Sequence, residues 1–365
     1  MDIQLSTEQP SERVDMVPGN EPIRTRAVPV CPVCGQDGYV LYQSIVDRWH
    51  GVAGPWQTMR CIRCESGWLN PVPVPDDLAS CYLASYYTHD DPPPPTMGSS
   101  KSIAFLRGAV LSAQKGYRHL QPTTPFVRMI GWLLMLLPPV RWRASFGLGR
   151  MLVPFRENCR LLEIGCGDGG YLALMRMLGW DATGLEPDPV AAEVASRSSG
   201  CHVHVGMIES APFEPGSFDA IVSNHVIEHV YDPKAFVSMV ARLLSKDGVV
   251  VVRTPNFQSL GHRLFGADLY SLDPPRHLCL LTPNSLSDLF RNSGHFRSVK
   301  TASPTRDCRL AIRRRFAVLR TGNFLGEIKS SSGDRCFEFL FRALETFGNF
   351  AFHWGEEVEC TAIRK

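Results

Sequence analysis

Long apolar runs and a strong excess of charge are both missing from this sequence of 365 residues. The longest apolar run, residues 130–140, is too short to span a bilayer and is broken by Pro138 and Pro139. The net charge of +2 gives no reason to expect a nucleic acid as the main partner. The first residues lack a basic segment followed by an apolar one, so we expect no signal peptide and a cytoplasmic protein.

What is present is enough apolar material for a sizeable core. Hydrophobic residues make up 44% of the chain and charged residues 20%, which is typical of a globular protein. The length suggests one large domain and a smaller unit. Residues 1–27 are polar and contain several prolines, and we expect a disordered tail there.

Four of the twelve cysteines stand in two C-x-x-C pairs, Cys31 with Cys34 and Cys61 with Cys64. The pairs flank a segment of alternating residues that predicts a hairpin. Two such pairs form a tetrahedral thiolate site for Zn²⁺, which predicts a zinc ribbon over residues 28–70. A closed four-sulfur site leaves no open coordination position, so we expect the ion to be structural. The alternative, four unrelated buried cysteines, does not explain the paired spacing.

Residues 71–150 are predicted to form a linker and a helical cap. Prolines extend the linker 69–75, and residues 91–100 form a second, flexible linker. Residues 101–150 are apolar and basic with helical spacing. The cap would lie over the mouth of the domain that follows. An alternative is a helix that lies in a membrane interface, with Trp132 and Trp142 near its ends, and makes peripheral contact with a lipid-linked acceptor.

From residue 151 to 365 strands alternate with helices, which predicts an α/β domain with a parallel sheet covered on both faces. Two further strands are expected near residues 296–300 and 356–363. Between them lies an insertion, residues 307–354, with helical periodicity; it would complete an acceptor pocket or form a dimer face. The first five strands are expected near residues 160–164, 181–186, 202–206, 218–223 and 248–253, and the helices near 169–178, 189–198 and 233–245.

A glycine-rich turn, residues 165–170, follows the first strand of this domain. Such a turn lets a ligand approach the backbone at the start of a helix. Glu163 stands two residues before the first glycine, and Glu186 ends the next strand about 20 residues after the turn, where a carboxylate can accept both ribose hydroxyls of a nucleoside. The turn has no lysine and contains Asp168, so it suits a cationic or neutral ligand better than a pyrophosphate.

The run Glu163-Ile-Gly165-Cys-Gly167-Asp-Gly169 resembles the first motif of class I S-adenosylmethionine-dependent methyltransferases. The resemblance implies a Rossmann-like seven-stranded sheet whose last strand is antiparallel, with S-adenosyl-L-methionine as cofactor. It also implies that the segment after residue 206 contacts adenine, although Met207 stands where many members have an acid. The cofactor-binding residues implied are Glu163, Gly165, Cys166, Gly167, Gly169, Glu186, Pro187, Met207, Ile208, Glu209, Asn224 and His225.

Three polar residues follow the fourth strand of the predicted sheet. His225, Glu228 and His229 would share one face of a helical turn. The string is also compatible with a zinc hydrolase motif, but Pro233 leaves too little room for the helix which that motif needs. It is similar to strings in ubiquinone-pathway O-methyltransferases, which are proposed to hold a divalent ion there; His225 replaces the first acid. A structural alternative is that Glu228 caps a helix and His229 packs under the methionine moiety.

His277 lies in a loop stiffened by prolines. With Tyr87 and the preceding zinc ribbon, this layout resembles that of nucleotide-sugar C-methyltransferases, in which such residues face the acceptor. The catalytic candidates are therefore His277, His229, His225 and Tyr87, and a histidine suits a general base near neutral pH.

The sequence thus predicts methyl transfer to a small-molecule or glycan-type acceptor. The resemblance favours a sugar nucleotide or a lipid-linked saccharide, and a phenolic or polyketide acceptor stays open. Two alternatives belong to other classes of protein. One is an NAD-dependent oxidoreductase, which also uses a glycine turn and an acid; the other is a non-catalytic zinc-ribbon adaptor with a vestigial cofactor site.

Overall fold

The computed structural model describes residues 23–82, 90–120, 124–136, 144, 146, 148, 151–304, 308–324 and 332–365. The candidate Tyr87 and the tryptophan at position 142 therefore lie outside the described residues. Within the described ranges, no helix has the length and apolar character needed to cross a bilayer.

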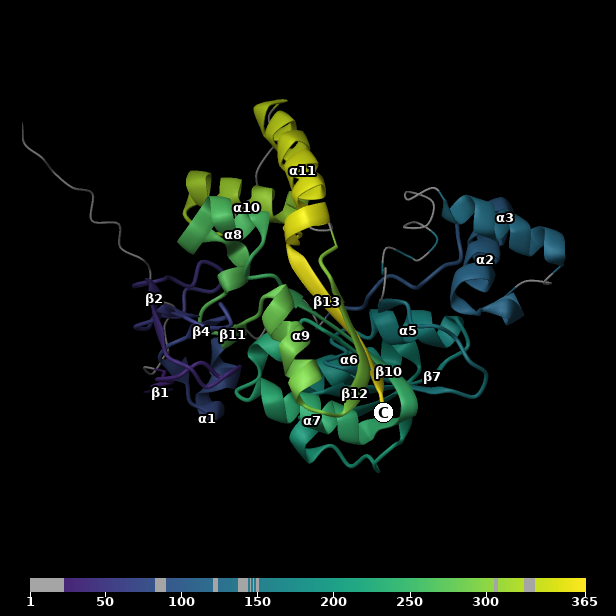
Figure 1. The fold of residues 1–365 in the computed structure, drawn as a ribbon, viewed down its shortest axis with the longest axis horizontal. Coiled ribbons are helices and arrows are strands. Elements are labelled where there is room, and N and C mark those ends of the chain that lie inside the picture. Colours follow the sequence, from purple (N-terminus) through teal and green to yellow (C-terminus); the bar gives the residue numbers. More distant parts are fainter. Residues whose placement is uncertain are drawn as a thin grey trace, which may run out of the picture.

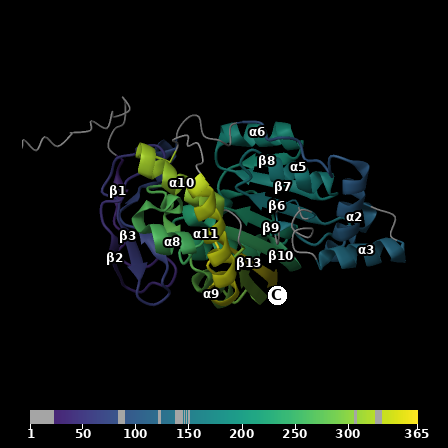
Figure 2. The ribbon, with the colours of Figure 1, turned by 90° about the horizontal axis from the view of Figure 1, so that it is seen from above.

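A seven-stranded sheet forms the centre of the molecule (Figure 2). The strand β13 runs antiparallel to both of its neighbours, whereas the other pairs of adjacent strands are parallel. This confirms the predicted sheet with its antiparallel last strand. The order across the sheet is β12 (Phe296–Ala302), β13 (Glu357–Arg364), β10 (Leu244–Pro255), β9 (Phe218–Asn224), β6 (Arg160–Ile164), β7 (Asp181–Glu186) and β8 (His202–Val205).

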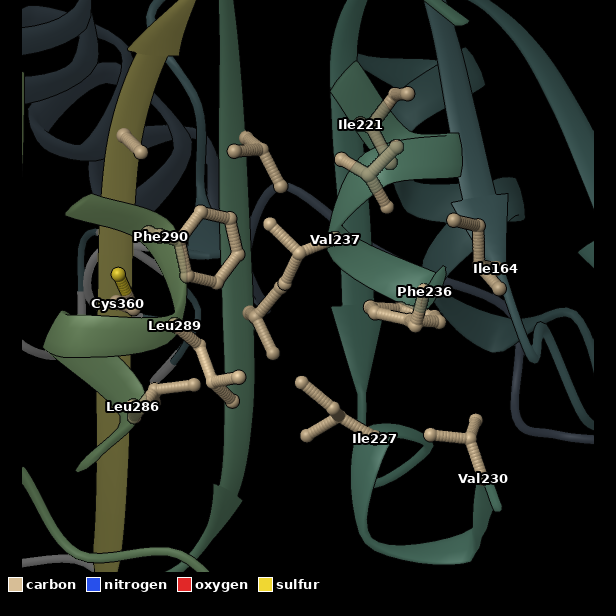
Figure 3. Packing of buried hydrophobic residues seen from close by; sticks show 14 of the residues in the cluster. Ile164, Ile221, Ile227, Val230, Phe236, Val237, Leu286, Leu289, Phe290 and Cys360 are labelled. Atoms are coloured by element: carbon tan, nitrogen blue, oxygen red, sulfur yellow. The ribbon is translucent and has the colours of Figure 1, made fainter. Parts of the chain in front are cut away.

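Helices cover both faces of this sheet. Successive residues of a strand point to opposite faces, and the strands here carry apolar side chains on both. On one face, α7 (Pro233–Leu243) and α9 (Pro283–Asn292) pack on the side of the sheet that carries Ile164 and Ile221. Figure 3 shows Phe236 and Val237 of α7 in this core. Burial of one such side chain stabilises the fold by about 1.5–3 kcal/mol. On the other face lie α5 (Gly170–Met177) and α6 (Pro189–Ser199).

The cysteine-containing module is a small antiparallel sheet of β2 (Gly38–Tyr42), β3 (Thr58–Cys61) and β4 (Gly67–Leu69). Its fourth strand, β11 (Cys279–Leu280), comes from the loop just after His277. Buried residues of the module, including Trp68, share a core with the central domain. The module is therefore not an independent unit ending at residue 70, as the predicted boundary implies, because the domain predicted to begin at residue 151 supplies one of its strands.

Part of the stretch predicted to be a disordered tail, residues 1–27, forms regular structure. Residues Thr25–Arg26 form β1, which pairs with β5 (Val72–Pro73) and ties the start of the described chain to the linker. Asp77 in α1 (Pro75–Leu78) strengthens this contact, because its carboxylate accepts hydrogen bonds from the backbone and side chain of Arg24.

The helices α2 (Lys101–Lys115) and α3 (Pro125–Met135) pack against each other as a helical hairpin. It lies at the end of the molecule opposite the cysteine module (Figures 1 and 2). The chain after α2 packs where β7 begins: Trp180 Nε1–H donates to the Tyr117 hydroxyl at 3.0 Å. This part of the predicted cap therefore contacts the amino-terminal edge of the sheet, whereas a cap over the mouth would contact the carboxyl edge.

The predicted helical insertion contains α10 (Cys308–Thr321) and α11 (Ser332–Phe352), and α11 projects away from the sheet in Figure 1. The short helix α8 (Leu260–Phe265) packs beneath α10. The remaining helical turns are of the 3-10 type: Ala79–Cys81, Arg118–Leu120, Ile208–Ser210, Ile227–His229, Gly266–Asp268 and Tyr270–Leu272.

Candidate functional site

The glycine turn connects β6 to α5 at the carboxyl edge of the sheet. Gly165 has φ +72, and a Cβ added there would lie 2.3 Å from Cγ2 of Val226, on the neighbouring loop after β9. Gly169 has φ +79, and its Cβ would lie 2.7 Å from backbone atoms of Ala195. Both the backbone conformation and the space therefore require glycine at these two positions.

Acidic side chains surround this turn. The Gly167 N–H donates to Glu186 Oε2 at 2.9 Å, so the carboxylate at the end of β7 lies against the turn, as predicted from its spacing. Glu163 is buried in β6, and its Oε2 has no hydrogen-bond partner among the described residues. Burial, followed by the nearby carboxylates of Asp168 and Glu186, raises the pKa of Glu163 well above its ordinary value. The turn is thus suited to a ligand that carries positive charge or donates protons.

This arrangement fits S-adenosylmethionine, which has a sulfonium, an ammonium group and a ribose diol. An orphaned buried carboxylate oxygen gains a partner from an ammonium group, because the charge-assisted hydrogen bond offsets part of its desolvation. A pyrophosphate would instead add negative charge beside three carboxyl groups. The acids at this turn therefore favour the sulfonium nucleoside over NAD.

The other predicted cofactor residues surround the same edge, although several offer only backbone atoms. Cys166 is buried, and its sulfur packs against Gly184, where an added Cβ would lie 2.7 Å away. Ile208 belongs to the core, whereas Met207 is 46% exposed and its side chain is accessible to a ring. Glu209, Pro187 and Asn224 are exposed at the ends of neighbouring elements.

His225 takes a different position from the one predicted. Its Nδ1 lies 3.0 Å from Glu228 Oε1 and its Nε2 lies 2.9 Å from Glu357 Oε1. Burial alone lowers the pKa of His225, but the two carboxylates outweigh it and raise that pKa to about 10. The same contacts lower the pKa of Glu228 to about 2 against the opposing effect of burial. His225 is thus a protonated bridge between two carboxylates, which does not suit a general base or a cofactor contact.

The other two histidines do come together, from segments far apart in the sequence. His229 Nδ1 lies 3.0 Å from the Arg276 carbonyl oxygen and 3.2 Å from the Tyr82 hydroxyl. His277 Nδ1 lies 2.8 Å from the Ser271 carbonyl oxygen. A carbonyl oxygen only accepts, so each Nδ1 carries a proton, and in the neutral form of either ring Nε2 presents a lone pair.

A carboxylate completes this cluster. The two rings meet edge to face with centroids 4.7 Å apart, and ligand atoms of Glu228, His229 and His277 all lie within 4.8 Å of one another. Burial and then the charge of His277 lower the pKa of His229 to about 4, so His229 is neutral at neutral pH. One potential ligand atom from each of these three residues therefore lies close enough to the others for a proton donor or a cation to contact all three.

Tyr82 and Arg276 were missed by sequence reasoning. No sequence signal separates Tyr82 from the neighbouring tyrosines; only its contact with His229 does. Arg276 is almost fully buried, and its guanidinium contacts Asp47 of the cysteine module, Asp273 and the Cys81 carbonyl oxygen. The hydrogen bonds and charge of Arg276 outweigh burial and lower the pKa of Asp47. The loop that carries His277 is therefore held by the cysteine module.

The four predicted metal ligands do meet. The Sγ atoms of Cys31 and Cys64 lie 3.6 Å apart, those of Cys34 and Cys61 lie 3.4 Å apart, and all four lie within 4.8 Å. A tetrahedron with Zn–S bonds of about 2.3 Å has edges of about 3.8 Å, close to these separations. The backbone N–H groups of Arg63 and Cys64 point at Cys61 Sγ, which stabilises a thiolate. The donor set fits a structural Zn²⁺.

Comparisons with known proteins point to the same fold. A family described as a methyltransferase domain matches residues 143–295. Ubiquinone biosynthesis O-methyltransferase from Xanthomonas campestris is 34% identical over 129 residues, 34% of this chain and 52% of that protein. Over residues 143–295 the chain is therefore similar to a methyltransferase domain. The corresponding enzyme from Cereibacter sphaeroides is 30% identical to this chain over 153 residues, 39% of this chain and 62% of that protein.

The chain spans about half the length of the first of these relatives. A solved structure described as an S-adenosylmethionine-dependent methyltransferase from Thermotoga maritima covers 64% of the chain and all of its own length, with 20% identity and a TM-score of 0.41.

Proposed function

We propose that this chain transfers the methyl group of S-adenosylmethionine to an ionisable hydroxyl of a small-molecule acceptor. The observation that carries the proposal is the convergence of His229, His277 and Glu228 beside the glycine turn. Strands β6 and β9 are adjacent, and Val226 touches Gly165, so the acceptor groups and the donor site share one edge of the sheet. Methyl transfer needs this proximity because the two reactants must meet at about 3 Å.

On the donor side, each residue has a distinct task. Glu186, whose carboxylate lies against the glycine turn, would accept the ribose hydroxyls. Glu163 would accept the ammonium group, and the glycine turn would admit the amino-acid end. Residues 207–209 would border the adenine, with the Met207 side chain against the ring. When bound, the cofactor supplies an already activated methyl group.

On the acceptor side, the chain mainly positions the hydroxyl and removes its proton. His277 Nε2 presents a lone pair, and Asp273 Oδ2 lies 3.8 Å from that nitrogen, so a proton taken there is stabilised by a carboxylate. Tyr82 and the Arg276 carbonyl oxygen orient the ring of His229. A divalent cation held by Glu228, His229 and His277 is a second way to satisfy the same three groups, and it would lower the pKa of a bound hydroxyl instead.

The acceptor class follows from two resemblances that point in different directions. The layout of zinc ribbon, tyrosine and loop histidine favours a sugar nucleotide or a lipid-linked saccharide. The relatives named for ubiquinone biosynthesis favour a phenolic acceptor. Both classes carry a hydroxyl, and the acidic proton of a phenol is the easier one for a histidine to remove.

A structural Zn²⁺ at Cys31, Cys34, Cys61 and Cys64 is part of the same proposal. It would hold the small sheet whose fourth strand follows His277. The ion would therefore support the loop that carries His277 without touching the substrate.

The test is labelling of metabolites by the purified full chain. A cell extract incubated with methyl-deuterated S-adenosylmethionine should gain labelled products by mass spectrometry, and His277→Gln should lose them. Addition of magnesium or manganese to metal-depleted buffer distinguishes the histidine base from the cation. Absence of any labelled product across extracts that contain phenols and sugar nucleotides would remove the proposal.

A further inference from the structure

The outer face of α3 is apolar. Its inner face packs on α2 at Gly131, where an added Cβ would lie only 2.3 Å from the Ala109 carbonyl oxygen. Residues three or four positions apart on the opposite side should be polar in a surface helix, because they face water. Here they are all apolar and between 50% and 75% exposed: Phe126, Met129, Trp132, Leu133 and, one residue past the helix, Leu136. The described part of the chain leaves this face uncovered.

The partner helix extends the apolar surface. Ile103, Phe105 and Leu106 of α2 are each about two-fifths exposed. The hairpin lies at the end of the molecule opposite the cysteine module in both views (Figures 1 and 2). A partner bound there would therefore leave the module accessible.

The charge of this region is as distinctive as its apolar face. Between Pro92 and Arg156 the sequence contains nine Lys and Arg residues and no Asp or Glu, whereas the whole chain has a net charge of only +2. The described cations Lys101, Arg118 and Arg156 are exposed. Exposed cations in the same stretch of sequence as an apolar face that contains tryptophan complement a bilayer with anionic head groups.

We propose that the hairpin of α2 and α3 docks on membranes that contain anionic phospholipid, with α3 lying in the plane of the interface. Phe126, Trp132 and Leu133 enter the acyl boundary, and the surrounding cations meet the head groups. A second copy of the chain is a poorer occupant, because pairing two such faces brings like charges together. This docking does not depend on methyl transfer.

The test is co-sedimentation of the full chain with vesicles. We expect the protein to sediment with phosphatidylcholine vesicles that contain one-third phosphatidylglycerol, weakly with phosphatidylcholine alone, and less as salt is raised. The double variant Trp132→Ser/Leu133→Ser should lower the affinity for the anionic vesicles by about ten-fold or more. The matched control is Phe339→Ser/Phe347→Ser, which removes two apolar side chains from α11 that are even more exposed than Trp132 and Leu133, and it should leave affinity unchanged.

Three results overturn the proposal. They are equal binding to neutral and anionic vesicles, equal loss in the α3 and α11 variants, and a dimer in vesicle-free solution that the α3 variant dissociates. Binding of S-adenosylhomocysteine by calorimetry serves as the fold control. An α3 variant that keeps this binding but no longer sediments with anionic vesicles supports docking at this face.

Discussion

The Arg276 guanidinium lies 2.7 Å from the Asp47 carboxylate, and both side chains are almost fully buried. Asp47 belongs to the loop between β2 and β3 of the cysteine module, while Arg276 directly precedes His277. The same guanidinium holds Asp273 and the Cys81 carbonyl oxygen. Arg276 thus fixes the loop that carries His277 to both the cysteine module and the segment that carries Tyr82.

Breaking this buried pair should destabilise the protein strongly. Arg276→Met leaves Asp47 and Asp273 without their cation, and removal of one partner of a buried pair costs about 3–5 kcal/mol. Denaturant unfolding should show this loss. Arg276→Lys keeps the charge but not the two-pronged geometry, so it should recover only part of the stability.

Arg276 should also matter for turnover, as a residue that positions His277. Arg276→Lys is expected to lower kcat while the Kd for S-adenosylhomocysteine stays within about two-fold of wild type, because the donor site lies on other strands. Equal weakening of donor binding and turnover would show a general loss of structure and would contradict a positioning role.

Metal removal should affect catalysis as well as folding. We expect close to one equivalent of zinc per chain by elemental analysis, lost in Cys34→Ser/Cys64→Ser. Because β11 pairs with β4, loss of the ion should loosen the loop after His277 and reduce methyl transfer. Hydrogen exchange should report faster exchange at residues 276–282. Unchanged exchange and full activity in a zinc-free protein would disprove this coupling.

His225 and His277 should respond differently to substitution. His277→Gln should lower kcat by about 10²–10⁴-fold, the usual contribution of a general base. His225→Gln should mainly lower the Tm, since its protonated ring separates the carboxylates of Glu228 and Glu357. The pH profile of kcat measured for both variants checks the assignment. A comparable loss of kcat in His225→Gln at a temperature where it remains folded would move the base to His225.

Glu356 gives a prediction about stability and pH. Burial raises its pKa to about 8, against the hydrogen bonds from Gly261 and Ser259 that favour the charged form. The folded carboxyl thus holds its proton more tightly than the unfolded one. Its contribution is fully present below the unfolded pKa and is lost as pH rises through the folded pKa.

The free energy of unfolding should therefore fall between pH 5.5 and 7.5 by about 2–3 kcal/mol more in wild type than in Glu356→Gln. Urea unfolding at several pH values measures this difference. Parallel curves for the two proteins would show that Glu356 is already ionised in the folded state.

The glycine turn and the clustering of the four cysteines could be predicted from the sequence because their signals are local. The turn at residues 165–170 and the C-x-x-C pairs are short spacings that fix backbone geometry. The position of Glu186 could be predicted because the carboxyl end of the second strand lies at the same edge of the sheet as the glycine turn.

The surroundings of His229 and His277 could not be predicted from the sequence, because residues far apart in the chain form them. Arg276 and Asp47 are 229 positions apart, and Tyr82 and His229 are 147 apart. A two-residue strand such as β11 has no periodicity to detect. Local spacing grouped His225 with His229, but a positive φ of 55° at His225 accompanies a ring that reaches Glu357 on another strand.

The most direct test of the account is calorimetric titration of the full chain with S-adenosylhomocysteine and with NAD, in wild type and Glu186→Ala. The account predicts binding of one S-adenosylhomocysteine per chain with a Kd of about micromolar order, weakened about ten-fold or more by the substitution, and no heat with NAD. Binding of NAD in place of S-adenosylhomocysteine, or undiminished affinity in Glu186→Ala, would contradict it.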